Sequence, residues 1–210
     1  MINILIADDH PIVREGLKQI IAEAPDIVVA AEASNGYELL DKVRNIDFSV
    51  VVLDITMPGI TGLDVLKQLK SEKPGLPILI LSMHSEEQYA VRVLRAGASG
   101  YLTKASAPDQ LIGAIRKVFR GGKYVSPSVA EKLAYELDSE SEKQPHEYLS
   151  DREYQVLCLI ASGKTVKVVA EELSLSVKTV STYRSRILDK MRMNSNAEIT
   201  HYAIKHRLVD

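Results

Sequence analysis

Cysteine is nearly missing from this sequence, because Cys158 is the one cysteine among 210 residues. A single cysteine cannot form an internal disulfide, which excludes a disulfide-rich secreted scaffold and fits a reducing compartment. Long apolar runs are also missing, since no window of the sequence approaches a membrane span. Met1 leads directly into an apolar segment without the basic stretch of a secretion signal. We therefore expect a soluble cytoplasmic protein that does not engage a membrane.

The balance of charge differs between the two parts of the chain. Residues 1–148 carry 16 Lys and Arg against 21 Asp and Glu, whereas residues 149–210 carry 10 against 7. The net charges of these parts are −5 and +3, although the whole chain carries only −2. An acidic first part and a basic second part favour two modules, the second with a polyanion as its partner.

Apolar runs alternate with amphipathic segments along the first 120 residues. The runs are apolar on both faces, as buried parallel strands are. They predict strands at Ile2–Ala7, Ile27–Ala33, Val50–Leu53, Ile78–Leu81 and Ser99–Leu102. The segments between them predict helices at about 11–23, 36–45, 62–70, 86–96 and 107–119. Five β-α repeats are typical of an α/β domain with a five-stranded, doubly wound parallel sheet.

A polar, charged segment at 138–148, DSESEKQPHEY, has the composition of a linker. Before it, Pro127 in a first turn predicts a helix near 126–137. After it the pattern is all-helical, with expected capping boxes at Ser150–Glu153 and Ser195–Glu198. Four helices, at about 151–161, 165–173, 177–191 and 196–206, predict a helix-turn-helix module. The expected organisation is a domain at 1–121, a linker at 122–148 and a domain at 149–210.

Polar side chains stand at the ends of four of the five predicted strands. They are Asp8 and Asp9 after the first strand, Asp54 after the third, Ser82 after the fourth and Lys104 after the fifth. The carboxyl ends of parallel strands meet at one edge of the sheet, where ligands bind. Each residue alone has an ordinary explanation, since aspartate caps helices and opens turns, serine stands in turns and lysine is common on surfaces. Their arrival at the same edge favours a shared site.

A cluster of carboxylates at such an edge suits phosphoryl chemistry. Carboxylates repel one another unless they are neutralised, and Mg²⁺, which prefers oxygen ligands, does this. The ion would then accept phosphoryl oxygens, with Asp54 as the nucleophile. Ser82 is placed to donate a hydrogen bond to the phosphoryl oxygens, and Lys104 would pair with the transferred group. The expected product is an aspartyl phosphate.

Four segments around these residues, IADDHP, VVLDITMPGITG, ILILSMHS and GYLTK, resemble the signature segments of bacterial two-component receiver domains. The resemblance implies a flavodoxin-like fold and a histidine kinase as the phosphoryl donor. It implies Asp54 as the phosphoacceptor, Asp8, Asp9, Asp54 and the Thr56 backbone carbonyl as metal ligands, Ser82 and Tyr101 as switch residues, and Lys104 as the phosphate-pairing lysine.

The main enzymatic alternative is a phosphohydrolase. An enzyme of the haloacid-dehalogenase type also uses a strand-tip aspartate as its nucleophile, but it needs a second aspartate two residues further on as a general acid. Thr56 stands at that position. We therefore expect the phosphoryl group to turn over slowly, as a signal requires, and we expect no enzyme.

The predicted helix 177–191 has two different faces on a 3.6-residue period. Its apolar side carries Val177, Val180, Ile187, Leu188 and Met191. The opposite side is short-chained, hydrogen-bonding and basic, which suits phosphate contacts and base readout in a DNA groove, although any amphipathic helix leaves one face solvated. The helix before it is expected to cross the DNA backbone. The expected DNA contacts are Lys164, Thr165, Lys167, Lys178, Ser181, Thr182, Ser185 and Arg186.

The segment LSDREYQVLCLIASGKTVKVVAEELSLSVKTVSTYRSRILDKM resembles the LuxR-type DNA-binding module that ends response regulators of the NarL/FixJ family. Its TVKVVAEELSLSVKTVSTYRSRIL run is similar to the GacA/UvrY type. The resemblance implies a transcription regulator that phosphorylation unmasks or dimerises, with DNA and RNA polymerase as partners. A regulator that acts mainly through protein contacts is the remaining alternative.

The last predicted helix, 196–206, is the usual dimerisation element of that family. Ala197, Tyr202 and Ala203 could supply contacts between two copies of the chain, and a core role is equally open for each. A homodimer of the phosphorylated chain is therefore the expected active form.

Two residues depart from the simple pattern. Arg184 lies within the apolar side of helix 177–191, and we expect its guanidinium to pair with a carboxylate such as Glu153. Val168 points away from the apolar face of its own helix, where the family usually has a charged residue. Tolerated exposure and contact with the other domain are both open for Val168.

Overall fold

The computed structural model describes residues 1–83, 86–138, 144–206 and 208–209. The chain forms two compact units, Met1–Ala134 and Tyr135–Asp210, and the division runs through helix α6 (Pro127–Asp138). Residues 139–143 of the expected linker, and residues 207 and 210 of the expected second domain, lie outside the described residues. Among the helices that are described, none is long and apolar enough to cross a membrane.

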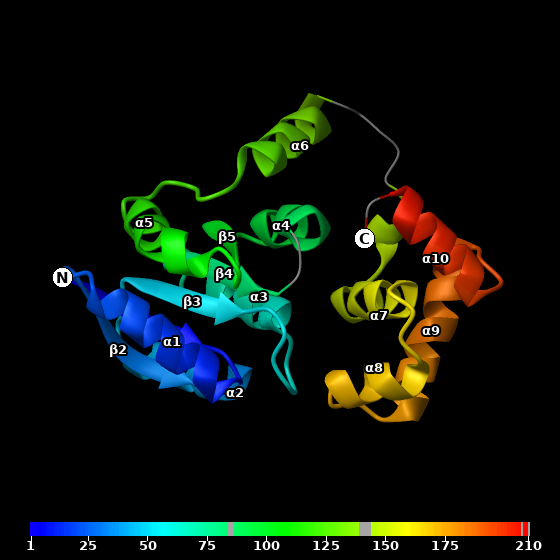
Figure 1. Ribbon diagram of the computed structural model, residues 1–210, viewed down its shortest axis with the longest axis horizontal. Helices are drawn as coiled ribbons and strands as arrows, with labels where there is room; N and C mark the ends of the chain where they lie inside the picture. The colour runs from blue at the N-terminus through cyan, green and yellow to red at the C-terminus, as the bar shows by residue number, and fades with distance from the viewer. Residues whose placement is uncertain (84–85, 139–143, 207, 210) are drawn as a thin grey trace. The chain divides into compact units, whose positions relative to one another are not determined.

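The first unit contains a parallel sheet of five strands in the order β2-β1-β3-β4-β5 (Figure 1). The strands are β1 (Ile2–Ala7), β2 (Ile27–Ala33), β3 (Val50–Asp54), β4 (Ile78–Ser82) and β5 (Gly100–Thr103). Every residue of β3 and β4 is buried, because their valine, isoleucine and leucine side chains are covered on both faces of the sheet. In this strand order the topological switch point lies between β1 and β3.

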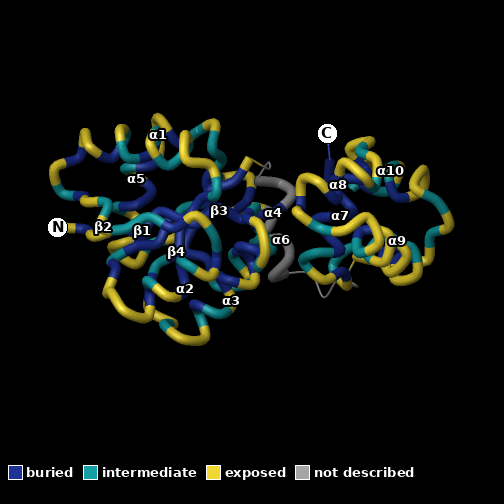
Figure 2. Tube along the Cα trace, turned by 90° about the horizontal axis from the view of Figure 1, so that it is seen from below, coloured by how far each residue is buried: buried dark blue, intermediate teal, exposed yellow. Residues whose placement is uncertain are grey.

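Helices cover both faces of this sheet. They are α1 (Pro11–Ala22), α2 (Gly36–Asn45), α3 (Gly62–Glu72), α4 (Glu86–Arg95) and α5 (Ala107–Phe119). On one face, Leu17 of α1 and Leu111 of α5 join a buried cluster that includes Ile2, Ile4 and Ile6 of β1. Figure 2 shows α1 and α5 on one side of the strands and α2 and α3 on the other. The predicted doubly wound α/β fold is confirmed.

Strand register places the expected site residues at one edge. Asp54 pairs with Leu81, and Ser82 pairs with Thr103, so β3, β4 and β5 end at the same level. Helix α3 then begins directly beneath the end of β3. A Cβ atom on Gly62 would lie only 2.4 Å from the carbonyl oxygen of Asp54, so glycine alone permits this approach. The loop between Asp54 and Gly62 is thereby tied to the strand end.

The strand boundaries differ slightly from those expected from the sequence. Asp54 and Ser82 are the last residues of β3 and β4 rather than the first residues after them. β5 begins at Gly100, one residue later than predicted. Gly100 packs against the backbone of Tyr124, where a Cβ would lie 2.7 Å from the carbonyl oxygen, and the same oxygen accepts a hydrogen bond from the Tyr101 N–H at 3.0 Å. This contact from a distant segment is not visible in a local pattern.

The second unit is helical in its described residues. Besides the end of α6, it contains η1 (Pro145–Tyr148), α7 (Asp151–Ala161), α8 (Val166–Glu172), α9 (Val177–Met191) and α10 (Asn196–Lys205). α7 packs against both α9 and α10, and α8 packs against α9. Their shared core contains the fully buried side chains of Val156, Leu157, Val180, Ile187 and Ile199. The predicted all-α, four-helix helix-turn-helix domain is confirmed.

One of the two expected capping boxes is complete. Ser150 Oγ accepts the Glu153 N–H at 3.4 Å, and the Glu153 carboxylate accepts the Ser150 N–H at 2.7 Å. At the start of α10, Ser195 Oγ accepts the Glu198 N–H at 3.3 Å. The Glu198 carboxylate, however, accepts the Asn194 N–H at 3.1 Å. A capping box requires it to accept the Ser195 N–H, so the prediction of a second capping box was wrong in this bond. The spacing of the two residues does not determine which backbone amide the carboxylate reaches.

Candidate functional site

Asp54 lies at the centre of the candidate site and is 2% exposed. Its Oδ2 accepts a hydrogen bond from Lys104 Nζ at 2.7 Å, and its Oδ1 accepts the Thr56 N–H at 2.9 Å. Both carboxylate oxygens are therefore held, one by a charged side chain and one by the loop that Gly62 anchors. The buried strand presents this carboxylate in a fixed orientation.

Lys104 links the ends of three strands. Its Nζ lies 2.6 Å from Asp8 Oδ2 as well as 2.7 Å from Asp54 Oδ2, and its side chain is 8% exposed. Its backbone N–H donates to the Ser82 carbonyl at 2.7 Å, which continues the pairing of β4 and β5 beyond Thr103. One ammonium thus faces two buried carboxylates, so an excess of negative charge remains.

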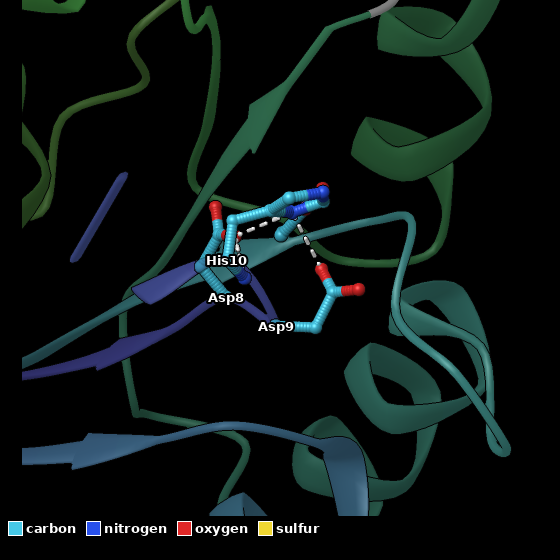
Figure 3. A group of neighbouring side chains, drawn as sticks. Asp8, Asp9 and His10 are labelled. Atoms are coloured by element: carbon cyan, nitrogen blue, oxygen red, sulfur yellow. Dashed lines mark hydrogen bonds and ion pairs between the residues drawn. The ribbon is translucent and has the colours of Figure 1, made fainter. Parts of the chain in front are cut away.

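Asp9 and His10 extend the cluster toward solvent. The His10 Nδ1 lies 2.9 Å from Asp9 Oδ1 and 3.2 Å from Asp8 Oδ1. Figure 3 shows the His10 ring turned toward both carboxylates. Reasoning from strand ends missed His10, although it directly follows Asp9 in the IADDHP segment and was a visible signal there.

Burial dominates the ionisation of the site. It raises the pKa of the Asp54 carboxyl from 3.8 to about 6; the Lys104 ammonium opposes this rise, and the Asp8 carboxylate adds to it. Burial also favours the neutral form of Lys104, but the carboxylates of Asp54 and Asp8 outweigh it, and the pKa of Lys104 is raised. At neutral pH Asp54 is therefore an ionised carboxylate beside a charged lysine.

The donor set fits a divalent cation. Asp8, Asp9, His10 and Asp54 each offer one ligand atom, and these atoms lie within 4.8 Å of one another. Carboxylate oxygens are the ligands that Mg²⁺ prefers, and the charge that Lys104 leaves uncompensated would be neutralised by such an ion. The Thr56 N–H donates a hydrogen bond to Asp54 Oδ1. The expectation that the Thr56 carbonyl binds the metal ion stays a prediction.

Ser82 and Tyr101 are both buried within the sheet. Ser82 ends β4 and is fully buried, and its carbonyl accepts the Lys104 N–H, while Tyr101 lies near the start of β5 and is 1% exposed. Their assignment as switch residues stays a prediction.

The expected DNA-contacting residues lie just before α8, on α8 and on α9. All of them except Lys164 are exposed. Lys164 is half-buried, because its Nζ binds both carboxylate oxygens of Glu172 at 2.8 Å. Thr165 also caps α8, since its Oγ1 accepts the Val168 N–H at 3.4 Å. Glu172 was not expected here, because it ends α8, eight residues after Lys164, which precedes that helix.

The apolar side of α9 is shorter than expected. Val180, Ile187 and Met191 are buried, whereas Val177 is 51% exposed. The expectation that Val177 belongs to the buried side was wrong, because the first turn of α9 extends beyond the core. Val168 on α8 is 38% exposed, as its outward position predicted, and the described residues give it no further role.

The expected pairing of Arg184 with Glu153 is wrong. Arg184 Nε donates to Asn196 Oδ1 at 2.6 Å and thereby joins α9 to the start of α10. Glu153 is buried and accepts instead from Lys190 Nζ at 2.6 Å. Lys190 stands six residues after Arg184 on α9, so the basic partner of Glu153 comes from nearer the end of the helix than expected.

The three residues considered for dimerisation have different environments. Ala203 is fully buried in the core of the second unit, which leaves it no surface for a partner. Tyr202 is half-buried: its hydroxyl bonds to His146 Nδ1 at 2.8 Å, and its ring stacks on His206 with centroids 4.1 Å apart. Ala197 is exposed on α10 and borders a surface hollow. His146, from η1, was not expected to reach α10.

The fold and the two sites define a class of protein in which a phosphoryl-receiving domain is joined to a DNA-binding module. Residues 4–116 match the model of the response regulator receiver domain, and residues 147–203 match that of the luxR family of bacterial regulatory proteins. The chain belongs to the response regulators with a LuxR-type DNA-binding domain. It is a phosphorylation-dependent transcription regulator.

Relatives in other bacteria align over nearly the whole chain. The response regulator GacA of Pseudomonas protegens is 37% identical over 210 residues, which are 100% of this chain and 99% of the relative. UvrY of Escherichia coli is 37% identical over 209 residues, 99% of this chain and 96% of the relative. RcsB of Salmonella enterica, in a structure bound to the rprA promoter with the phosphomimetic BeF3⁻, is 27% identical to this chain, with a TM-score of 0.65. The match covers 96% of this chain and 98% of the RcsB chain.

Proposed function

We propose that Asp54 accepts a phosphoryl group from a histidine kinase and that this event controls DNA binding by α8 and α9. The observation that carries the proposal is the position of Asp54: a buried carboxylate at the end of β3, bonded to Lys104 and to the Thr56 N–H. A carboxylate held in this way is oriented for attack before the donor arrives. Membership of the receiver family supplies the kinase as its partner.

The transfer follows from the groups around Asp54. A carboxylate oxygen of Asp54 attacks the phosphorus of a phosphohistidine, the P–N bond breaks, and its electron pair returns to the imidazole of the kinase. Lys104 then exchanges its contact with the carboxylate for one with the phosphoryl oxygens, and Ser82 donates a hydrogen bond to them. Mg²⁺, held by Asp8, Asp9, Asp54 and the Thr56 carbonyl, would supply positive charge beside those oxygens when bound.

The same site is poorly equipped for enzymatic turnover. A phosphohydrolase of the haloacid-dehalogenase type needs a general acid two residues after its nucleophile, and Thr56 occupies that position with its N–H bonded to Asp54. We infer that the protein is a signal receiver and not an enzyme. Incubation with phosphoesters tests this inference: multiple turnovers that depend on Asp54 would contradict it.

The DNA contacts are proposed from the exposed residues of the helix-turn-helix domain. The side chains of α9, from Lys178 to Arg186, enter the major groove, and the start of α8 lies along the phosphates. Structures of the relative RcsB bound to promoter DNA support DNA as the partner of this domain. The residues are Lys164, Thr165, Lys167, Lys178, Ser181, Thr182, Ser185 and Arg186.

The proposed output is a phosphorylated homodimer that acts on promoters in the cytoplasm, with RNA polymerase as a further partner. Phosphorylation adds about −1.5 to −2 charge at the end of β3, and Ser82 and Tyr101 transmit its effect along β4 and β5. We propose 1–121 as the receiver, 122–148 as the linker and 149–210 as the DNA-binding domain. Two copies would read half-sites about one helical turn apart or a multiple of it.

Labelling with a radioactive phosphoryl donor tests the role of Asp54. Asp54→Asn should abolish the label while the far-ultraviolet circular dichroism spectrum stays unchanged. Asp41→Asn is the matched control, because Asp41 is an exposed carboxylate on α2, away from the strand ends. It should be labelled like the unmodified protein. Full labelling of Asp54→Asn would remove Asp54 from its proposed role.

A further inference from the structure

His10 occupies the N-cap of α1 but does not cap it. N-cap side chains usually accept a hydrogen bond from the first turn of their helix. The His10 side chain makes no such bond, and Pro11 follows it at the start of α1. The ring turns instead toward Asp8 and Asp9 (Figure 3).

The carboxylates determine this orientation of the ring. The His10 side chain is 64% exposed, so packing does not hold it in place. Its Nδ1 lies 2.9 Å from an oxygen of Asp9 and 3.2 Å from an oxygen of Asp8. The same ring belongs to the group whose ligand atoms, together with one from Asp54, all lie within 4.8 Å of one another. Without an ion, Nδ1 bonds to these carboxylates as an N–H donor. A cation held by the same carboxylates would replace that proton on the imidazole nitrogen, and the proton would leave to solvent.

We propose that His10 donates an imidazole nitrogen to the divalent cation of the receiver, so that the site has mixed oxygen and nitrogen donors. The inference rests on the metal site of the proposed function. Imidazole suits transition ions, whereas Mg²⁺ takes oxygen ligands and keeps its waters. A nitrogen ligand therefore favours a transition ion over Mg²⁺, and Mn²⁺, which also suits carboxylate ligands, is the paramagnetic probe for such a site.

Pulsed electron paramagnetic resonance of the full-length protein loaded with Mn²⁺ tests this assignment without any measurement of activity. The expected spectrum contains modulation from a directly bound ¹⁴N nucleus, which changes when histidine is labelled with ¹⁵N. His10→Ala should remove the modulation. The substitution leaves the capping of α1 intact, because the His10 side chain does not contribute to it. His201→Ala is the control, since His201 is exposed on α10 in the other unit, and it should keep the modulation.

Titration with Mn²⁺ and Mg²⁺ gives a second readout. His10→Ala should weaken Mn²⁺ binding by at least roughly tenfold. Loss of a group that only supports a metal ligand already weakens binding by about 10- to 100-fold, and His10 is proposed as a direct ligand. Its affinity for Mg²⁺ should change much less. His10→Gln offers an amide oxygen in place of the nitrogen, and it should keep Mg²⁺ affinity while losing the preference for Mn²⁺.

The outcomes separate the inference from the proposed function. Mn²⁺ that binds in a manner dependent on Asp54, with no ¹⁴N modulation, would overturn the role of His10 and leave the metal site in place. A failure of Mn²⁺ and Mg²⁺ to bind at all would overturn the metal site itself. Modulation that persists in His10→Ala would assign the nitrogen to another residue and equally overturn the inference.

Discussion

At the scale of single residues, the most consequential feature is that Asp54 is ionised while buried. Its carboxylate accepts hydrogen bonds from Lys104 and from the Thr56 N–H, yet burial still raises its pKa to about 6. The folded protein therefore holds this charge less readily than water does. A reactive carboxylate at this position is obtained at the expense of stability, as expected of a functional group.

Replacement of Asp54 should therefore stabilise the protein in the absence of divalent ions. Because the pKa is raised on folding, from 3.8 to about 6, the ionised carboxyl lowers the free energy of unfolding as pH rises through that window. Above it, Asp54→Asn should raise the free energy of unfolding of the receiver by about 1–3 kcal/mol.

Calorimetric unfolding of the full chain in chelator at pH 4 and pH 8 measures this effect. The gain should be present at pH 8 and small at pH 4, because pH 4 lies close to the ordinary pKa of 3.8, where the raised pKa of the folded state has little effect on stability. Asp41→Asn, at an exposed position, should change neither value. Equal stabilisation by Asp54→Asn at both pH values would contradict the raised pKa.

Side-chain partners were harder to predict than side-chain positions. The run from Val50 to Leu53 placed Asp54 correctly, since a buried strand fixes where its end lies. The partner of Arg184 could not be read in the same way, because it depends on how α9 is rotated against α7 and α10. Successive residues of a helix are about 100° apart, so the sequence alone does not show that Arg184 reaches Asn196 while Lys190 reaches Glu153.

Glu153 and Arg184 should consequently differ in their effect on stability. Glu153 is buried and accepts from Lys190 and the Ser150 N–H, so Glu153→Ala should lower the free energy of unfolding of the second unit by about 2–3 kcal/mol. Arg184→Ala removes a bond near the surface and should lower it by less than about 1 kcal/mol. Chemical denaturation measures both, and a larger loss for Arg184→Ala would refute the assigned pairing.

At the scale of elements, local patterns predicted the existence and type of the strands and helices well. Periodicity marks a buried strand or an amphipathic helix without knowledge of its neighbours. It was less informative where a distant segment decides the outcome. Tyr124 determines where β5 begins, and the limit of the core leaves Val177 exposed. His10 and Glu172 were missed because their importance arises only when the carboxylates or Lys164 lie next to them.

The ion pair across α8 should weaken DNA binding. Lys164 is one of the proposed phosphate contacts, but Glu172 holds its ammonium with both carboxylate oxygens. Glu172→Gln should release Lys164 for a contact with a DNA phosphate. The plot of the logarithm of affinity against the logarithm of salt concentration should then become steeper, its slope changing by about −0.9 for one added phosphate contact.

Binding curves at several salt concentrations, with the full-length protein and one DNA fragment, measure this slope. Glu171→Gln is the control, because Glu171 is an exposed neighbour with the same charge and no part in the pair. It should raise affinity slightly through net charge and leave the slope nearly unchanged. Identical slopes for the two variants would show that Lys164 gains no contact with phosphate.

At the scale of the whole molecule, a phosphoryl group on Asp54 has to change the behaviour of a separate unit. Moving a two-state equilibrium almost completely takes about 5.5 kcal/mol of differential stabilisation. The proposed contacts of Lys104 and Ser82 with the phosphoryl oxygens would be charge-assisted, and a bound divalent ion would strengthen them further. The proposed dimerisation would add to the response, because two linked DNA-binding domains would engage two half-sites together.

Dimerisation through α10 gives the last prediction. Ala203 is buried in the core, and Tyr202 is engaged by His146 and His206, so Ala197 is the most accessible of the three expected contacts. A charged side chain at that position would have to be buried in the interface, which is costly without a partner. Ala197→Arg should therefore keep the phosphorylated protein monomeric in sedimentation experiments.

Ala22→Arg, at an exposed alanine of α1, is the control and should dimerise normally. Phosphorylation itself should be unaffected in both variants, because neither alanine belongs to the cluster of side chains around Asp54. A phosphorylated Ala197→Arg dimer of undiminished stability would place the interface on another surface.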